Sequence, residues 1–294
     1  MRKLIVWTCL AIGLATGALA QDKPRVVAVN YPLHYFAERI LGDAVEVAFP
    51  VPEGVDPSFW RPSISDISDI QSADLILLNG AGFAAWIDRV SLPRSKIVNT
   101  SAGFKDSYIA TETITHSHGD GGEHSHEGTA TYTWLDPDLA ALQAESIATA
   151  AVARGLVAEA DIAPRLAALR AELEALDAEA TAAVADLQDT ILIATHPRYQ
   201  YFARAYGVTI RSLEWEAGAA PTADQLATLE ALATETGARV LIWESQPPAE
   251  ALEATAALGL RNVVFDPLAN TVPGTDLLRA YSDSLTALSD VPRN

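Results

Sequence analysis

Short apolar runs alternate with helical patterns along this chain, and the alternation occurs in two separate sets. The expected strands of the first set are 25–30, 45–51, 74–79 and 96–98, and those of the second are 190–195, 208–213, 239–244 and 262–266. The expected helices between them are 32–41, 63–71 and 82–90, then 198–205, 222–236 and 249–258. Strands that alternate with helices form parallel sheets joined by right-handed crossovers. The fold class that follows is α/β, with two parallel-sheet lobes.

A long amphipathic pattern separates the two sets. Between residues 163 and 187, apolar residues recur at steps of three and four, which is the spacing of one helix face. They are Leu166, Leu169, Leu173, Leu176, Ala180, Val184 and Leu187. Pro164 near the start suits a first-turn position, and about 24 residues would span roughly 36 Å. We expect a rigid helix over 161–188 that joins an N-terminal lobe (21–160) to a C-terminal lobe (189–294).

The first 20 residues predict a secretory signal peptide. Arg2 and Lys3 precede a mostly apolar stretch, and a small-x-small cleavage site, Ala18-Leu19-Ala20, ends it. The stretch is too short for a membrane span, and Cys9 lacks the context of a lipoprotein cleavage site. We therefore expect a protein that is soluble in the periplasm after cleavage.

Composition narrows the function. Cys9 is the only cysteine, so the mature chain would have no disulfide, thiolate metal site or cysteine nucleophile. The formal charge of −18 argues against binding nucleic acid and permits binding a cation. No Gly-x-Ser-x-Gly, His-Glu-x-x-His or dinucleotide motif is present. We therefore expect no enzyme activity, while a role in adhesion or storage stays open.

One polar, glycine-rich segment holds four of the six histidines. Residues 115–128 contain His116, His118, His124 and His126, with no apolar residue that would anchor a core. Imidazole is the commonest side-chain ligand for borderline metals, and a short His-rich tract indicates metal binding. We expect a flexible metal-capture loop that takes up an ion and hands it over.

Polar residues also follow the expected strands, at the edge where open α/β sheets bind ligands. In the N-terminal lobe they are Asn30, Tyr31, His34, Asp56 and Ser58. In the C-terminal lobe they are His196, Glu214, Glu216, Glu244 and Asp266. One histidine and several carboxylates are thus expected to lie at one edge of the second sheet.

Four motifs carry a resemblance to a known family. They are Gly54-Val55-Asp56-Pro57-Ser58-Phe59-Trp60-Arg61-Pro62-Ser63, Tyr132-Thr133-Trp134-Leu135-Asp136-Pro137, Thr195-His196-Pro197-Arg198-Tyr199-Gln200-Tyr201-Phe202-Ala203 and Phe265-Asp266-Pro267-Leu268. In this order they resemble the zinc/manganese solute-binding proteins of bacterial ABC importers, the ZnuA-like branch in particular. The resemblance implies two lobes joined by a long backbone helix, a metal cleft between the lobes and an ABC permease that accepts the metal. A periplasmic metal chaperone is a further possible partner, and we expect a monomer.

The resemblance also implies a ligand set. The family's four ligand positions fall on Ser58, Tyr132, His196 and Asp266. His196 and Asp266 keep the family's donors, whereas Ser58 and Tyr132 replace histidines. His34 is a candidate for the missing nitrogen ligand. Further candidate carboxylate ligands are Glu214, Glu216 and Glu244.

The expected function is capture of a transition-metal ion, zinc first, and its delivery to an ABC importer. Zinc sites commonly use several imidazoles, which the His-rich loop would supply. A set of imidazole, carboxylate and phenolate donors is harder and would suit Fe(III) better than zinc. Iron, manganese and a metal already held by an organic chelator therefore remain alternatives.

Overall fold

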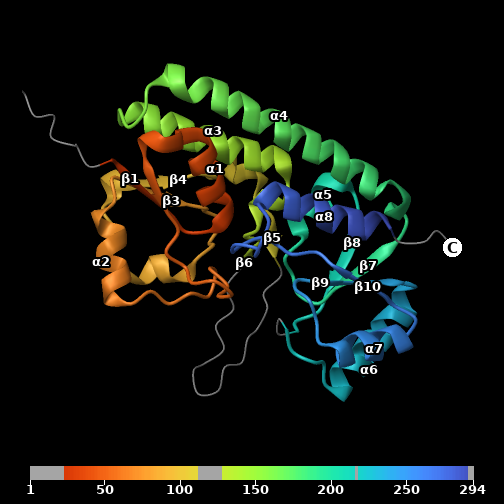
Figure 1. Ribbon diagram of the computed structural model, residues 1–294. Helices are drawn as coiled ribbons and strands as arrows, with labels where there is room; N and C mark the ends of the chain where they lie inside the picture. Colours follow the sequence, from red (N-terminus) through yellow and green to blue (C-terminus); the bar gives the residue numbers. More distant parts are fainter. Residues whose placement is uncertain (1–22, 112–127, 216–217, 291–294) are drawn as a thin grey trace, which may run out of the picture.

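The computed structural model describes residues 23–111, 128–215 and 218–290 and shows two lobes side by side (Figure 1). The predicted signal peptide, the four loop histidines and Glu216 lie outside the described residues. Over the described ranges, no helix combines the length and apolar character needed to cross a bilayer.

The first lobe is built on a four-stranded parallel sheet in the order β2-β1-β3-β4. Its strands are β1 (Arg25–Ala28), β2 (Glu46–Ala48), β3 (Leu75–Leu78) and β4 (Ile97–Asn99), and its crossover helices are α1 (Tyr31–Leu41) and α2 (Ile64–Ser72). The central strands β1 and β3 are almost wholly apolar and buried. This composition is typical of parallel strands covered on both faces.

The second lobe repeats this design in the order β10-β9-β7-β8, again with parallel pairing throughout. Its strands are β7 (Ile191–Ala194), β8 (Thr209–Ser212), β9 (Val240–Trp243) and β10 (Arg261–Val264). Its helices are α5 (Gln200–Tyr206), α6 (Ala223–Thr236) and α7 (Ala249–Ala257). The prediction of two parallel-sheet lobes is confirmed.

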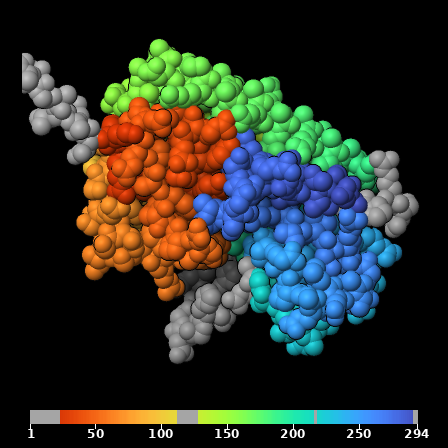
Figure 2. All heavy atoms as spheres, viewed as in Figure 1, coloured from red at the N-terminus to blue at the C-terminus, as the bar shows by residue number. Residues whose placement is uncertain are grey.

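The remaining helices are α3 (Pro137–Ala153), α4 (Glu159–Ala183) and α8 (Leu277–Ser289), and α8 contacts both α1 of the first lobe and β10 of the second. The helix α4 runs along one side of both lobes (Figure 1) and packs against α1, α3 and α8. At 1.5 Å per residue its 25 residues span about 38 Å. In Figure 2 the blue surface of α8 lies directly against the red surface of α1, so the lobes are in contact as well as bridged.

Two local predictions need correction. The long helix begins at Glu159, so Pro164 is its sixth residue and lies inside the helix, where it removes one backbone hydrogen bond. Residues 82–90 form no α-helix but only the 3-10 helix Ala85–Arg89. Ala81 and Ala84 just before it have φ of 52° and 63°, which places them in the left-handed region and prevents a regular helical start.

Other short 3-10 helices occur at Gly42–Ala44, Arg94–Lys96, Ala102–Ser107, Thr133–Leu135 and Ala185–Leu187. The antiparallel strands β5 (Ala110–Thr111) and β6 (Gly128–Thr129) enclose the position of the His-rich segment. The base of this hairpin is fastened to α5, because the hydroxyl of Tyr201 donates to the Ala130 carbonyl at 3.1 Å. The amide of Ile109 in turn donates to Tyr201 Oη at 3.4 Å.

Candidate functional site

The carboxyl ends of three neighbouring strands present polar side chains at one edge of the second sheet. Asp266 follows β10, Glu244 follows β9, and His196 follows β7. Because β9 lies between β10 and β7, Glu244 is the middle residue of this row. Glu214 follows β8, the strand farthest from β10.

The ring of His196 is oriented by a backbone carbonyl. His196 Nδ1 lies 2.9 Å from the carbonyl oxygen of Trp215. The amide of Trp215 donates to the Thr195 carbonyl at 2.9 Å. This bond holds Trp215, and with it the carbonyl that His196 contacts, in place. A carbonyl only accepts hydrogen bonds, so Nδ1 carries the hydrogen and Nε2 of the neutral ring carries the lone pair. This is how a metal-binding histidine is usually held.

Asp266 begins a tight, buried turn. Its Oδ1 accepts a hydrogen bond from the amide of Leu268 at 2.7 Å, and Leu268 has a left-handed φ of 59°. The indole of Trp134 in the first lobe donates to the Pro267 carbonyl at 2.8 Å. Burial raises the pKa of Asp266 to about 6; the Leu268 amide offsets this in part, and Glu244 adds to it. The turn therefore holds a carboxylate whose charged form a nearby cation would stabilise.

We expect Asp266→Asn to raise the free energy of unfolding of the metal-free protein by about 3 kcal/mol above pH 7. The carboxyl has an ordinary pKa of 3.8 and a folded pKa of about 6. As pH rises, the Asp266 carboxyl therefore loses its proton in the unfolded chain before it does so in the folded protein. The folded protein loses stability as pH rises between these two pKa values. Asparagine cannot ionise, and its Oδ1 still accepts from Leu268. Urea denaturation of both proteins at pH 4 and pH 7.5 measures this, and a difference that does not grow with pH would contradict it.

A buried polar network positions Tyr132 on the first-lobe side. The side-chain amide of Asn79 donates to the Thr131 carbonyl at 3.0 Å, and Thr133 Oγ1 donates to Asn79 Oδ1 at 3.3 Å. Gln143 Nε2 also donates to Asn79 Oδ1, at 3.1 Å. Asn79 directly follows β3, so the network fastens the segment around Tyr132 to the carboxyl end of the first sheet.

Ser58 is hydrogen-bonded to a first-lobe carboxylate, and Tyr132 is buried near both residues. Ser58 donates to Asp56 Oδ1 through both its hydroxyl, at 2.6 Å, and its amide, at 2.8 Å. Tyr132 is 2% exposed, and burial raises the pKa of its hydroxyl far above the usual value, although Arg198 and Ser58 lower it in part. Tyr132 is therefore a neutral phenol here, and the hydroxyl hydrogen of Ser58 is already donated to Asp56.

The guanidinium of Arg198 connects these groups across the two lobes. Its Nη2 lies 2.8 Å from Asp56 Oδ2 of the first lobe, and its Nε lies 3.0 Å from Glu244 Oε2 of the second. It also stacks over the rings of Tyr132, at 4.7 Å, and Phe59, at 5.7 Å. Burial alone would lower the pKa of Arg198, but the nearby Tyr132, Asp56 and Glu244 outweigh burial and raise it. Arg198 is thus a permanent cation within the row of acidic side chains.

Sequence reasoning did not identify Arg198 as a functional residue. A signal was present, since a charged residue two positions after His196 falls at the ligand-binding end of β7.

His34 lies in a different environment from the other predicted ligands. Its Nε2 is 3.3 Å from Glu38 Oε2 on the same helix, and its ring is 6.0 Å from Phe49 and 6.3 Å from Tyr31. Burial lowers the pKa of His34, with Glu38 opposing the change. Its buried Nδ1 has no hydrogen-bond partner within the described residues. None of these contacts brings His34 to His196 or Asp266.

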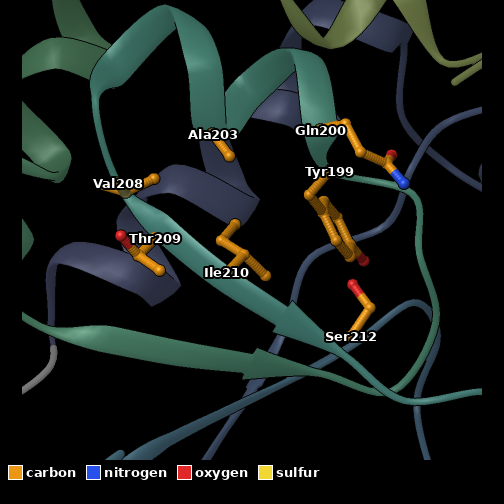
Figure 3. A pocket seen from close by; sticks show the side chains of 7 residues that line it. All are labelled: Tyr199, Gln200, Ala203, Val208, Thr209, Ile210 and Ser212. Carbon is orange, nitrogen blue, oxygen red and sulfur yellow. The ribbon is translucent and has the colours of Figure 1, made fainter. Parts of the chain in front are cut away.

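The predicted donors do not form a closed coordination sphere. Among residues 23–111, 128–215 and 218–290, no three His, Cys, Asp or Glu side chains are grouped as in a metal centre. A cavity of about 330 Å³ lies elsewhere, between α5 and β8 (Figure 3). The hydroxyls of Tyr199 and Ser212 point toward one another there, and none of the predicted ligands is among its lining residues.

Comparison with known proteins identifies the family. Residues 26–291 match the family described as zinc-uptake complex component A, periplasmic. The zinc-binding protein AdcA of Streptococcus pyogenes serotype M3 is 26% identical over 269 residues, which are 86% of this chain and 52% of AdcA. This chain thus spans about half the length of the curated relatives that it matches first. The manganese ABC transporter substrate-binding lipoprotein PsaA of Streptococcus pneumoniae is 27% identical over 224 residues, 71% of this chain and 70% of PsaA.

A solved structure supports the same assignment of fold. The Zn(II)-bound ZnuA-like domain of Streptococcus pneumoniae AdcA superposes with a TM-score of 0.77 at 19% identity, over 91% of this chain and 98% of that domain. The family match covers nearly all of the described residues. The chain therefore belongs to the family of the periplasmic zinc-uptake component A.

Proposed function

We propose that this chain is a periplasmic solute-binding protein that captures a transition-metal ion, zinc first, and delivers it to an ABC permease. The observation that carries the proposal is the pair of retained second-lobe donors in a chain of this family. His196 presents Nε2 as a lone-pair nitrogen, and Asp266 is a desolvated carboxylate that a cation would stabilise.

The remaining donors come from the first lobe or from the His-rich loop. The first-lobe candidates are Tyr132, Ser58 and His34. The loop candidates are His116, His118, His124 and His126. Zinc fits a set that includes imidazole nitrogen. Manganese is the second candidate, because the relative PsaA is named as a manganese transporter component.

We propose for the mature protein the division already expected from the sequence: an N-terminal lobe (21–160), a linking helix (161–188) and a C-terminal lobe (189–294). The protein acts as a soluble monomer after removal of residues 1–20 and catalyses no reaction. The sequence contains no Gly-x-Ser-x-Gly and no His-Glu-x-x-His motif, which supports this inference.

Metal binding by the purified mature protein tests the proposal. After treatment with a chelator and its removal, we expect one zinc per chain with a dissociation constant below 1 μM, roughly the range of a site with several protein donors. Isothermal titration with a competing chelator measures it, with manganese as the comparison. A strain that lacks the gene should grow poorly under zinc depletion and recover when zinc is added. Absence of saturable binding of either metal would overturn the proposal.

A further inference from the structure

The ion pairs of Arg198 remove two carboxylates from the set of possible metal donors. Glu244, with its side chain 9% exposed, uses Oε2 to accept from Arg198, and Asp56 uses Oδ2 in the same way. Asp56 Oδ1 is also occupied, because it accepts from Ser58. The two carboxylates nearest the guanidinium are thus neutralised and hydrogen-bonded before any cargo arrives.

Without Arg198, this edge of the second sheet would be rich in carboxylate oxygen. Glu244 follows β9, the strand that lies between those preceding Asp266 and His196, so it occupies the middle of this row at the same edge of the sheet. Mn²⁺ favours carboxylate and water oxygens, whereas zinc accepts imidazole nitrogen readily. If Glu244 and Asp56 were available as donors, the relative affinity of the site for manganese over zinc would therefore increase.

We propose that Arg198 is a positioning residue that sets metal preference, because it withholds Asp56 and Glu244 from the cargo and so disfavours Mn²⁺ relative to Zn²⁺. This role rests on the proposed function, in which the cleft takes up a divalent cation. Arg198 touches no metal in this account, and it acts through the two carboxylates that it holds.

The shape of the side chain fits this role. Arg198 uses two different edges of its planar guanidinium, Nε for Glu244 and Nη2 for Asp56. Its face lies over the rings of Tyr132 and Phe59. A lysine ammonium is a compact point charge that lacks this two-edged, stacked geometry. Lysine at this position would keep the charge and lose part of the hold on the carboxylates.

The test compares zinc and manganese affinities of wild type and Arg198→Gln, each metal alone at pH 7.5. We expect the preference for zinc over manganese to fall at least 10-fold, chiefly through tighter Mn²⁺ binding. Arg198→Lys should give a smaller fall. Arg204→Gln is the matched control, since Arg204 lies on α5, has a side chain 41% exposed, and contacts Tyr201 and Asp136 rather than Asp56 or Glu244. Its preference should equal that of wild type.

A second variant covers the case in which Arg198→Gln does not fold. That change leaves Glu244 buried without its cation, which costs stability. Arg198→Gln combined with Glu244→Gln removes the uncompensated charge and releases Asp56 alone, so the preference should fall about 3-fold. Glu244→Gln by itself should retain the wild-type preference, because Arg198 still holds Asp56. Thermal melting establishes which variants are folded.

The outcomes separate this inference from the proposed function. A folded Arg198→Gln protein, or a folded double variant, with the wild-type preference overturns the role of Arg198 and leaves the proposed function standing. If wild type binds neither metal, the proposed function is wrong. A gain of Mn²⁺ binding by Arg198→Gln would then still support the role of Arg198, and no gain would overturn both.

Discussion

Replacing both His196 and Asp266 by alanine is expected to weaken zinc binding at least about 100-fold, because a zinc site uses about four protein donors and this change removes two of them. The two side chains are held by Trp215 and Leu268 through backbone hydrogen bonds, so truncating them leaves the strands β7 and β10 intact. The loss should therefore occur in a folded protein. Each single substitution should cause a smaller loss than the double substitution.

Competition titration with a zinc chelator measures this effect, and circular dichroism verifies folding. Asp189→Ala is the control, since Asp189 is an exposed carboxylate just before β7. It should bind zinc as tightly as wild type. If the double variant binds zinc with unchanged affinity, the donors lie elsewhere, and the proposed metal site at His196 and Asp266 is wrong.

Phe265→Ala is expected to lower the free energy of unfolding by about 3–5 kcal/mol, the usual cost of deleting a buried aromatic ring. Phe265 is 0% exposed and belongs to a hydrophobic cluster that includes residues of both lobes. Its ring centroid is 5.3 Å from that of Tyr199, 5.1 Å from Phe202 and 5.5 Å from Tyr281. The cavity left by the ring would also loosen the support of the adjacent Asp266, so zinc binding should weaken as well.

Equilibrium unfolding in urea measures the loss in Phe265→Ala. Phe265→Leu keeps most of the apolar volume and should cost less. The control is Ile64→Ala, since Ile64 is 88% exposed at the start of α2 and should change stability by no more than about 0.5 kcal/mol. A loss in Phe265→Ala no greater than that in Ile64→Ala would show that the buried ring of Phe265 does not contribute the expected stability.

Much of the fold could be predicted from the sequence because parallel strands buried on both faces read as continuous apolar runs. The helix α8 was not predicted, although Leu277, Tyr281, Leu285 and Leu288 follow one helix face, so its signal was present. The helix α3 gave a weaker signal. It is rich in alanine and is buried on several sides, which leaves no single apolar face to detect.

For the site, strand ends were the useful guide. They placed His196 and Asp266 at one edge of the second sheet, because that placement depends only on strand direction. The ion pair between Arg198 and Asp56 joins residues 142 positions apart and depends on how the lobes meet. No local pattern encodes such a contact. The grouping of all the predicted ligands around one ion remains a prediction.

The hairpin β5–β6 affects how far the length of the segment between its two strands can vary. Its strands pair Ala110 with Thr129 and Thr111 with Gly128, so the chain departs and returns at one place, which Tyr201 secures to the other lobe. Lengthening a segment between two fixed ends costs little, about 0.6 kcal/mol per doubling. Insertions and deletions between these strands are thus nearly neutral for the fold. The length of the sequence between these strands can therefore change with little effect on the stability of the two lobes.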